Sequence, residues 1–378
     1  KLLIADEVGL GKTIEAGLLL RQAWLSGRAK RILVLAPRAV LTQWQIELRE
    51  KFNLNWPIYD GHDLRWYDCK ALSLSDRVER RVEREDWHNE SCVIVSSQLM
   101  RRADRAKELL VAQEWDLVIL DEAHHARRRG AGAGIGKDKG PNQLLKLMQG
   151  VKNRTKGLVL LTATPMQVHP VEVWDLLNLL GLPESWTEDS FNRFFEKVAA
   201  GNPTPEEFEW LAMLFRSVAD KYGPPSVESV VRQSKVGALG AKKVLAALSD
   251  KLQTPRKQLS AEQRRIALDV IKRNTPVARL ISRHTRDLLR QYQSAGKLNT
   301  RIATRHVQDE FVELSDRERE VYNAVEEYIS TAYNQAAAAE RNAVGFVMTI
   351  YRRRLASRFH ALATTLEERL KSVKSGKF

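Results

Sequence analysis

Five short apolar runs in the first 165 residues constrain the fold of this chain more than any other feature of its sequence. Each run has four or five residues and is rich in Leu, Ile and Val, which is typical of strands covered on both faces. The stretches between the runs have the apolar spacing of helices. Strands that alternate with helices favour a parallel sheet with right-handed crossovers. We therefore predict a parallel α/β lobe with strands at Leu2–Ala5, Ile32–Ala36, Cys92–Ser96, Leu117–Leu120 and Leu158–Leu161.

A different pattern follows Pro165. Three later segments have helical periodicity, with Pro and Gly breaks between them and no strand run of comparable length. They predict a helical module over residues 166–300. The three segments are Val168–Leu182, Glu206–Tyr222 and Ala261–Arg290.

The remaining residues are predicted to begin a second lobe that carries a helical insertion. Ile302–Leu314 has strand character, and Ser315 opens a capping-box pattern with Glu318. Ala343–Lys371 then has the periodicity of one long helical stretch. The predicted divisions are a lobe at 1–165, a helical module at 166–300 and an incomplete second lobe at 301–378.

The charge balance indicates a polyanionic partner. The chain has 61 Lys and Arg residues against 47 Asp and Glu residues, a net charge of +14, and each phosphate that a cation neutralises releases condensed counterions. Solvated charged faces are the alternative. Cys69 and Cys92 form no Cys-x-x-Cys pair, which argues against a zinc site or a disulfide framework. Because the chain has neither a membrane-length apolar run nor a signal peptide, we expect a cytoplasmic protein without a membrane partner.

A glycine motif between the first strand and the following helix has the features of a phosphate-binding loop. Gly9 and Gly11 allow backbone N–H groups to close around phosphates, and the helix N-terminus adds positive potential. Lys12 would reach the β- and γ-phosphates of ATP, and the Thr13 hydroxyl would bind Mg²⁺. Asp6 occupies the position at which the strict Walker pattern has glycine. The predicted nucleotide-binding residues are Glu7, Val8, Gly9, Leu10, Gly11, Lys12 and Thr13.

An acidic pair follows the strand run Leu117–Leu120. A carboxylate at the C-terminal end of a strand points into the crevice where open α/β sheets bind their ligands. Asp121 would hold Mg²⁺, and Glu122 would orient or deprotonate the attacking water. The alternative is a surface pair that caps the next helix. The phosphate loop upstream in the same chain favours the catalytic interpretation.

Threonines end the fifth strand run. Thr162 and Thr164 are placed to sense the γ-phosphate through hydrogen bonds to the acidic motif, with His124 as the coupling residue. Thr164-Pro165 is also a favourable N-cap and N1 pair for a helix. The two interpretations are compatible.

These three motifs, in this order, resemble those of superfamily-two helicases and translocases. Ala5–Thr13, Leu35–Pro37 with Gln43-Trp44 and Glu47, and Leu161–Gln167 resemble motifs I, Ia and III of the Swi/Snf group. Ser282–Arg286 resembles the basic segment that leads towards the second lobe of these proteins. The RapA-like prokaryotic branch is the most similar, on the features Glu7-Val8, His124-His125 and Arg353–Arg358. The resemblance implies a RecA-like P-loop NTPase fold.

The resemblance also implies a function. The implied function is that of a DNA-stimulated ATPase that translocates on double-stranded DNA and displaces or remodels bound protein. RNA polymerase or phage-defence proteins are the expected partners. The tracking strand would be contacted by Pro37, Arg38, Ser96 and Ser97. A basic run after the acidic motif is a further candidate for phosphate contacts, with a solvated face as its alternative, and consists of Arg127, Arg128 and Arg129.

Two other functions remain open from the sequence. One is a strand-separating helicase, and the other is a nucleotide-gated DNA-binding module that does not hydrolyse ATP. The presence of Lys12, Thr13, Asp121 and Glu122 favours hydrolysis. No arginine-rich, glycine-containing segment follows Ser282–Arg286, and arginine fingers contribute strongly to phosphoryl transfer. We therefore expect slow hydrolysis by these residues alone and faster hydrolysis when a second lobe is present.

Overall fold

The computed structural model describes most of the chain as two compact units, residues 1–302 and 303–378. The division lies next to the predicted start of the second lobe at residue 301, whereas the residues on both sides of the predicted boundary at 165 belong to the first unit. The described residues are 1–67, 79–81, 86–128, 140–165, 170–201, 203–300, 302–304, 308, 313–335 and 341–374.

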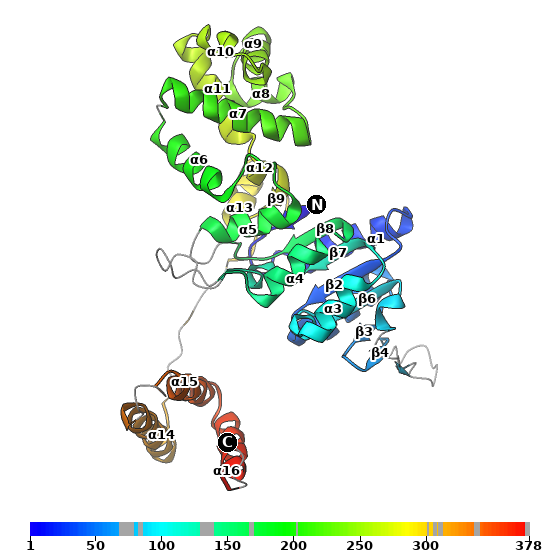
Figure 1. The fold of residues 1–378 in the computed structure, drawn as a ribbon, viewed down its shortest axis with the longest axis vertical. Helices are drawn as coiled ribbons and strands as arrows, with labels where there is room; N and C mark the ends of the chain where they lie inside the picture. Colours follow the sequence, from blue (N-terminus) through cyan, green and yellow to red (C-terminus); the bar gives the residue numbers. More distant parts are fainter. Residues whose placement is uncertain are drawn as a thin grey trace. The chain divides into compact units, whose positions relative to one another are not determined.

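A mostly parallel sheet forms the centre of the first unit (Figure 1). Among the described residues it has nine strands in the order β5-β4-β3-β6-β2-β7-β8-β1-β9. Neighbouring strands in the part β3-β6-β2-β7-β8-β1-β9 of this order pair in parallel. The pairs β3–β4 and β4–β5 at the other edge are antiparallel. This confirms the predicted α/β fold class. The strands are β1 (Leu2–Ile4), β2 (Ile32–Ala36), β3 (Ile58–Tyr59), β4 (Asp63–Arg65), β5 (Glu79–Arg81), β6 (Cys92–Ser96), β7 (Trp115–Leu120), β8 (Thr155–Leu161) and β9 (Ile281–Ser282).

All five predicted strands are present, and β2 and β6 have the predicted bounds. The β7 and β8 strands begin earlier than predicted, at Trp115 and Thr155, because polar residues interrupt the apolar pattern at their N-terminal ends. Strands β3, β4, β5 and β9 were not predicted. Each has only two or three residues, which is too short for a periodic signal.

Alternate residues of the central strands enter two separate cores. In β2, Ile32 and Val34 pack with the helices α1 (Lys12–Leu25) and α2 (Leu41–Phe52), whereas Leu33 and Leu35 belong to the core on the opposite face. That second face is covered by α3 (Ala103–Val111), α4 (Gln143–Val151) and α5 (Pro170–Leu180). Helices on both faces explain why every residue of β2 is apolar and buried.

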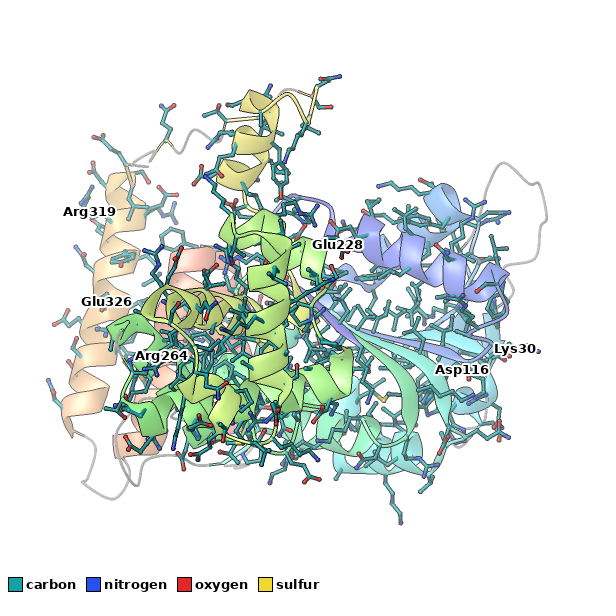
Figure 2. The ribbon with its side chains drawn as sticks, turned by 90° about the horizontal axis from the view of Figure 1, so that it is seen from above. Lys30, Asp116, Glu228, Arg264, Arg319 and Glu326 are labelled. Carbon is teal, nitrogen blue, oxygen red and sulfur yellow. The ribbon has the colours of Figure 1, made fainter. Side chains whose placement is uncertain are left out.

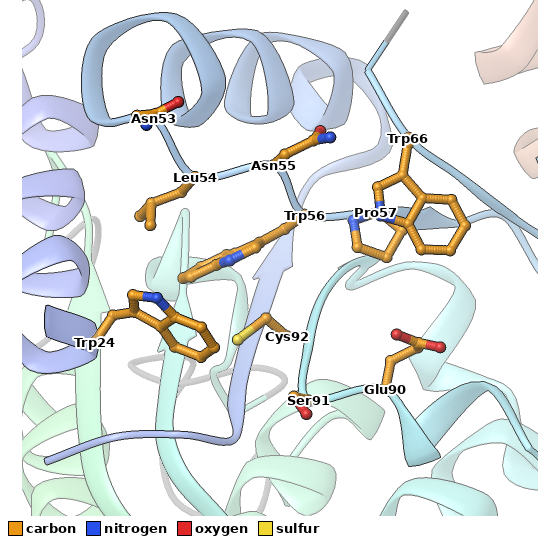
Figure 3. Close-up of a pocket in the computed structure, with 10 residues that line it drawn as sticks. All are labelled: Trp24, Asn53, Leu54, Asn55, Trp56, Pro57, Trp66, Glu90, Ser91 and Cys92. Carbon is orange, nitrogen blue, oxygen red and sulfur yellow. The ribbon is translucent and has the colours of Figure 1, made fainter. Parts of the chain in front are cut away.

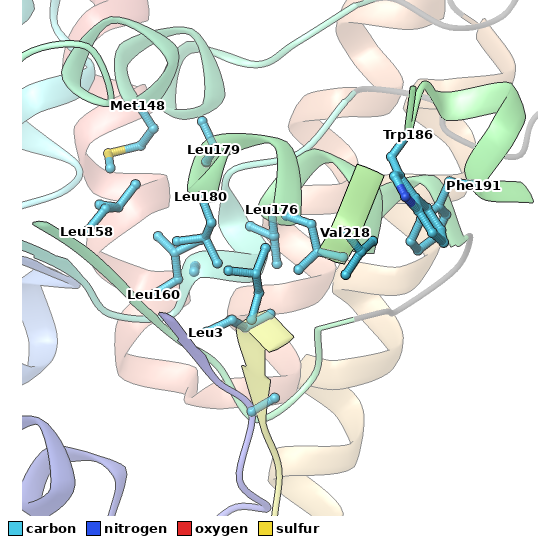
Figure 4. Packing of buried hydrophobic residues seen from close by; sticks show 14 of the residues in the cluster. Leu3, Met148, Leu158, Leu160, Leu176, Leu179, Leu180, Trp186, Phe191 and Val218 are labelled. Carbon is cyan, nitrogen blue, oxygen red and sulfur yellow. The ribbon is translucent and has the colours of Figure 1, made fainter. Parts of the chain in front are cut away.

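The helical module shares a core with the sheet. Figure 4 shows Leu3, Leu158 and Leu160 of the strands in the same cluster as Leu176 of α5 and Trp186. This continuity explains why residues 166–300 belong to the first compact unit. The helices of the module are α6 (Glu188–Ala200), α7 (Pro205–Tyr222), α8 (Val227–Ser234), α9 (Ala238–Ser249), α10 (Thr254–Lys257), α11 (Ala261–Arg273), α12 (Pro276–Leu280) and α13 (Arg286–Ser294).

The segment Ala261–Arg290, for which we predicted helical periodicity, contains three helices and the short strand β9. Helix α11 ends at Arg273, and Thr275 caps the short helix α12 by accepting a hydrogen bond from the Ala278 amide. The chain then extends as β9 and pairs in parallel with β1. The module therefore returns to the sheet, next to the strand that leads into the phosphate loop.

A half-buried aspartate fixes the edge of the sheet opposite the strand C-termini. The Asp116 carboxylate accepts hydrogen bonds from the backbone amides of Lys30 and Arg31, at 2.8 and 3.0 Å, and from Lys156 Nζ at 2.8 Å. Lys30 and Asp116 are labelled in Figure 2. The hydrogen bond from Lys156 contributes most to lowering the pKa of Asp116 to about 2. Asp116 therefore stays ionised and joins the start of β2 to the neighbouring β7 and β8.

The second unit is helical. Ser315 and Glu318 form the predicted capping box, since the Ser315 amide donates to Glu318 Oε2 at 2.9 Å and the Glu318 amide donates to Ser315 Oγ at 3.4 Å. The predicted helical stretch from Ala343 is interrupted at Arg358. Within Ile302–Leu314, residues 302–304, 308, 313 and 314 are not in a strand, and the others lie outside the described residues. The helices are α14 (Asp316–Gln335), α15 (Arg341–Ser357) and α16 (Phe359–Lys374).

No helix in the described parts of the chain combines the length and apolarity that a membrane crossing requires.

Candidate nucleotide-binding site and nucleic-acid interface

The loop between β1 and α1 has the backbone geometry of a phosphate-binding loop. Gly9 and Gly11 have φ values of +82° and +88°, which L side chains rarely adopt. Gly11 is the N-cap of α1, so the first amides of the helix face the loop without helical partners. Lys12 Nζ donates to the Asp6 carbonyl oxygen at 3.0 Å, and Thr13 is half-buried at the helix start. This arrangement fits a phosphate group.

The Asp121 carboxylate is oriented by two donors. Its Oδ1 accepts a hydrogen bond from the Glu122 amide and its Oδ2 accepts one from Trp44 Nε1, both at 2.8 Å. Burial raises the pKa of Asp121, while the positive charge of Lys12 acts in the opposite direction. The carboxylate and the Thr13 hydroxyl are hard oxygen ligands, which is the donor type that Mg²⁺ prefers.

Glu122 has an unusual backbone conformation. Its φ of +49° lies in the left-handed region, where a non-glycine residue is strained. The Glu122 carboxylate lies 3.2 Å from His124 Nδ1, and this contact is the main cause that lowers its pKa. Glu122 is therefore an anion at neutral pH, as a base or water-orienting group must be.

His124 joins the acidic motif to the threonine motif. Its Nδ1 lies 3.0 Å from Thr162 Oγ1 as well as 3.2 Å from Glu122. The Thr162 amide donates to the carbonyl oxygen of Ile4 at 3.0 Å, and the Thr164 amide donates to Thr162 Oγ1 at 3.2 Å. The structure thus brings the proposed coupling residues together with the strand that enters the phosphate loop.

The sequence places Trp44 in the segment that resembles motif Ia and does not reveal its hydrogen bond to Asp121. The indole is 1% exposed and belongs to the core beneath α1 and α2. Trp44 lies on α2, the helix that follows Pro37 and Arg38, and its indole N–H donates to Asp121 directly after β7. Only a contact between distant parts of the chain identifies Trp44 as an orienting group for Asp121, the predicted metal ligand.

Trp44→Phe is expected to weaken Mg²⁺ binding about 10-fold, because the ring remains in the core while Asp121 loses one of its two donors. The measurement is direct Mg²⁺ or Mn²⁺ binding in the presence of a non-hydrolysable ATP analogue. Trp56→Phe is the matched control. Trp56 lies in the same core cluster and lines a surface pocket of about 290 Å³ with Trp24 (Figure 3). Equal metal affinities in both variants would contradict the orienting role.

The proposed DNA-contacting residues gather at one edge of the sheet. Because β2 and β6 are parallel neighbours, Pro37 and Arg38 follow one strand beside Ser96 and Ser97 at the end of the other. The two serines are buried, at 5% and 2% exposure. Gln98, which we did not predict, joins the set, since its Oε1 accepts hydrogen bonds from the Arg38 amide at 2.9 Å and from Ser96 Oγ at 3.0 Å. Arg38 is exposed at this edge.

The basic run after the acidic motif does not act as one group. Arg128 forms ion pairs with Asp175 at 3.0 Å and Glu188 at 2.6 Å, so its charge joins the lobe to α5 and α6. The Arg127 side chain is 42% exposed and lies 3.8 Å from Glu172. Arg129 and the following glycines up to residue 139 lie outside the described residues. Within the described part of the run, Arg127 is the better candidate for a phosphate contact.

Family comparison agrees with the site geometry. Residues 1–359 match the SNF2-related domain family, and the chain belongs to this family. The membership confirms the Swi/Snf-type resemblance and the assignment to the helicase-like ATPases that the motifs indicated.

Individual relatives share part of the chain. RNA polymerase-associated protein RapA of Vibrio campbellii is 35% identical over 199 residues, which are 53% of this chain and 18% of the relative. RapA of Klebsiella pneumoniae is 34% identical over 180 residues, or 48% of this chain and 16% of that protein. The matched region therefore spans less than one fifth of either relative's length.

Solved structures also resemble the chain. The Sulfolobus solfataricus SWI2/SNF2 ATPase core in complex with dsDNA has 14% identity and a TM-score of 0.39, covering 99% of this chain and 60% of that one. The Pyrococcus furiosus Hef helicase domain has 16% identity and a TM-score of 0.33, covering 87% and 70%.

Proposed function

We propose that this chain is the ATP-binding part of a motor that translocates on double-stranded DNA and displaces or remodels bound protein. The observation that carries the proposal is the meeting of three motifs at neighbouring strand ends. Thr162 contacts His124 through its hydroxyl and Ile4 through its amide, and so links the acidic motif to the strand that enters the phosphate loop. Such a connection is what a nucleotide-sensing ATPase requires.

ATP would bind with its phosphates at Gly9–Thr13, and Lys12 would supply positive charge to the β- and γ-phosphates. Thr13 and Asp121 would hold Mg²⁺, whose charge neutralises the phosphate oxygens when it is bound. Glu122 would orient or deprotonate water, and His124 would hold the Glu122 carboxylate in place.

Double-stranded DNA would lie against the edge formed by Pro37, Arg38, Ser96 and Ser97, with Gln98 fixing the loop between them. The net charge of +14 supports a polyanionic partner. For the protein partner we propose RNA polymerase, on the similarity to RapA proteins. A phage-defence protein is the alternative that the sequence left open.

The test measures ATP turnover by the full-length protein, with and without double-stranded DNA of several sequences. We expect DNA to stimulate turnover without sequence preference, because phosphate contacts carry no sequence information. Release of a protein roadblock without strand separation on forked DNA would support translocation. Efficient strand separation would favour a helicase, and turnover that never responds to DNA would overturn the proposal.

DNA binding should weaken steeply with salt, and Arg127→Gln should reduce the slope of log K against log salt by about 1, since about one counterion is released per neutralised phosphate. Arg232→Gln, which removes an exposed charge from α8, is the matched control with an expected unchanged slope. An unchanged slope in Arg127→Gln would show that Arg127 does not contact DNA phosphate and that its role is the ion pair with Glu172.

A further inference from the structure

Five residues within the helical module, from Ser282 in β9 to Arg286 at the start of α13, lie alongside the phosphate loop. The Ala5 amide donates to the Ser282 carbonyl oxygen at 2.7 Å, and the Glu7 amide donates to the His284 carbonyl oxygen at 3.0 Å. These bonds continue the parallel pairing of β1 with β9 beyond the last strand residue, Ile4. The segment Ser282–Arg286, which we call the connector, thus runs beside the first half of the loop.

Side chains add a second set of bonds. The buried Asp6 carboxylate accepts hydrogen bonds from the His284 amide at 2.8 Å and lies 3.1 Å from His284 Nδ1. Glu7 Oε2 accepts a hydrogen bond from the Arg286 amide at 2.8 Å, and Glu7 Oε1 lies 3.0 Å from Arg286 Nη1. The loop and the connector therefore hold each other through both backbone and side-chain groups.

Arg286 makes the contact closest to the predicted phosphate cradle. Its Nη2 donates to the Val8 carbonyl oxygen at 2.7 Å. A Cβ atom on Gly9 would lie 3.2 Å from the same nitrogen, so the guanidinium packs directly against the glycine. One side chain thus fixes Glu7 by an ion pair, Val8 by its carbonyl group and Gly9 by contact.

A purely structural role would be to close the edge of the sheet. The backbone bonds to Ala5 and Glu7 do this without the Arg286 side chain. The ion pair of Arg286 with Glu7 is only partly buried, at 21% and 43% side-chain exposure, and exposed ion pairs contribute little to stability. The guanidinium instead contacts three consecutive residues of the turn Glu7–Gly9, at the start of the predicted nucleotide-binding loop.

We propose that Arg286 is a positioning residue of the phosphate loop. It holds the turn Glu7–Gly9 in the conformation that receives the nucleotide, and it makes nucleotide affinity depend on the connector, which joins α12 to α13 within the helical module. The inference rests on the proposed nucleotide binding at this loop. A preformed loop binds more tightly because less conformational freedom is lost on binding.

The test measures equilibrium binding of a fluorescent ATP analogue with Mg²⁺ to the wild-type protein and to three variants. Arg286→Ala should raise the dissociation constant about 10-fold, since it removes charge-assisted hydrogen bonds to Glu7 and Val8. Arg286→Lys should recover part of the affinity, because an ammonium group reaches one of these acceptors and not both in the same geometry. Arg283→Ala should bind as the wild type does, since Arg283 is the exposed arginine of the connector.

Two further measurements separate positioning from folding and from chemistry. Thermal unfolding of the nucleotide-free Arg286 variants should change little, and turnover at saturating ATP should fall less than about 2-fold while KM rises with the dissociation constant. Wild-type affinity in Arg286→Ala would overturn the inference. So would equal losses of affinity in Arg286→Ala, Arg286→Lys and Arg283→Ala. Absence of nucleotide binding by the wild-type protein would instead contradict the proposed function on which the inference rests.

Discussion

Glu122→Gln is expected to stop ATP hydrolysis while ATP binding stays intact. The amide has nearly the shape of the carboxylate, so the contact with His124, at 3.2 Å in the structure, can be kept with one rotamer. The amide cannot take a proton from water, and general-base catalysis contributes about 10²–10⁴ in rate. We expect turnover to fall at least about 100-fold, measured as phosphate release in the presence of DNA.

The control is the same substitution at a distant surface. Glu228→Gln, in the exposed first turn of α8, should leave both turnover and binding unchanged. Wild-type turnover in Glu122→Gln would remove Glu122 from the catalytic group. Loss of ATP binding together with turnover would show that Glu122 supports the phosphate loop and not the water.

Lys12→Ala is expected to abolish tight ATP binding. Within the described part of the chain, Lys12 Nζ has a single hydrogen bond, to the Asp6 carbonyl oxygen, so its removal costs the fold little. Its positive charge also partly offsets the rise that burial causes in the pKa of Asp121, and it adds to the lowering of the pKa of Glu122, which is due mainly to His124. The variant therefore loses the cation that faces the β- and γ-phosphates, and the dissociation constant should rise about 100-fold or more, as two charge-assisted hydrogen bonds are lost.

The matched control is Lys30→Ala, which removes an exposed ammonium group and keeps the backbone amide that donates to Asp116. Its ATP affinity should equal that of the wild-type protein. Calorimetric titration with a non-hydrolysable analogue gives both affinities directly. If Lys12→Ala kept wild-type affinity, the glycine loop would not be the phosphate site.

Residues near one another in the sequence determined the central lobe. Runs such as Ile32–Ala36 and Cys92–Ser96 consist almost wholly of apolar residues because helices cover both faces of the sheet. Burial of both faces requires apolar residues at consecutive positions, so the sequence shows it directly. The glycine loop and the acidic pair could also be recognised in the sequence as candidate site residues. Their chemistry needs particular residue types at fixed spacing directly after a strand, so a linear pattern contains it.

The short elements could not be predicted in this way. Strand β9 has two residues, and only its pairing with β1 makes it a strand. The helical stretch expected over Ala261–Arg290 is broken for the same reason, since the sheet edge offers backbone partners that helical periodicity does not reveal. Tertiary hydrogen bonds can override the local secondary-structure propensity of a segment.

The sequence alone determined the fold class and the family and predicted the nucleotide-binding residues, because each depends on local pattern. Only the tertiary structure decided which donor orients Asp121, which residue braces Glu7 and Val8, and that Arg128 is held by Asp175 and Glu188. These pairs are separated by dozens to hundreds of residues along the chain. A hydrogen bond or ion pair depends on distance and direction in space, and separation along the sequence specifies neither of them.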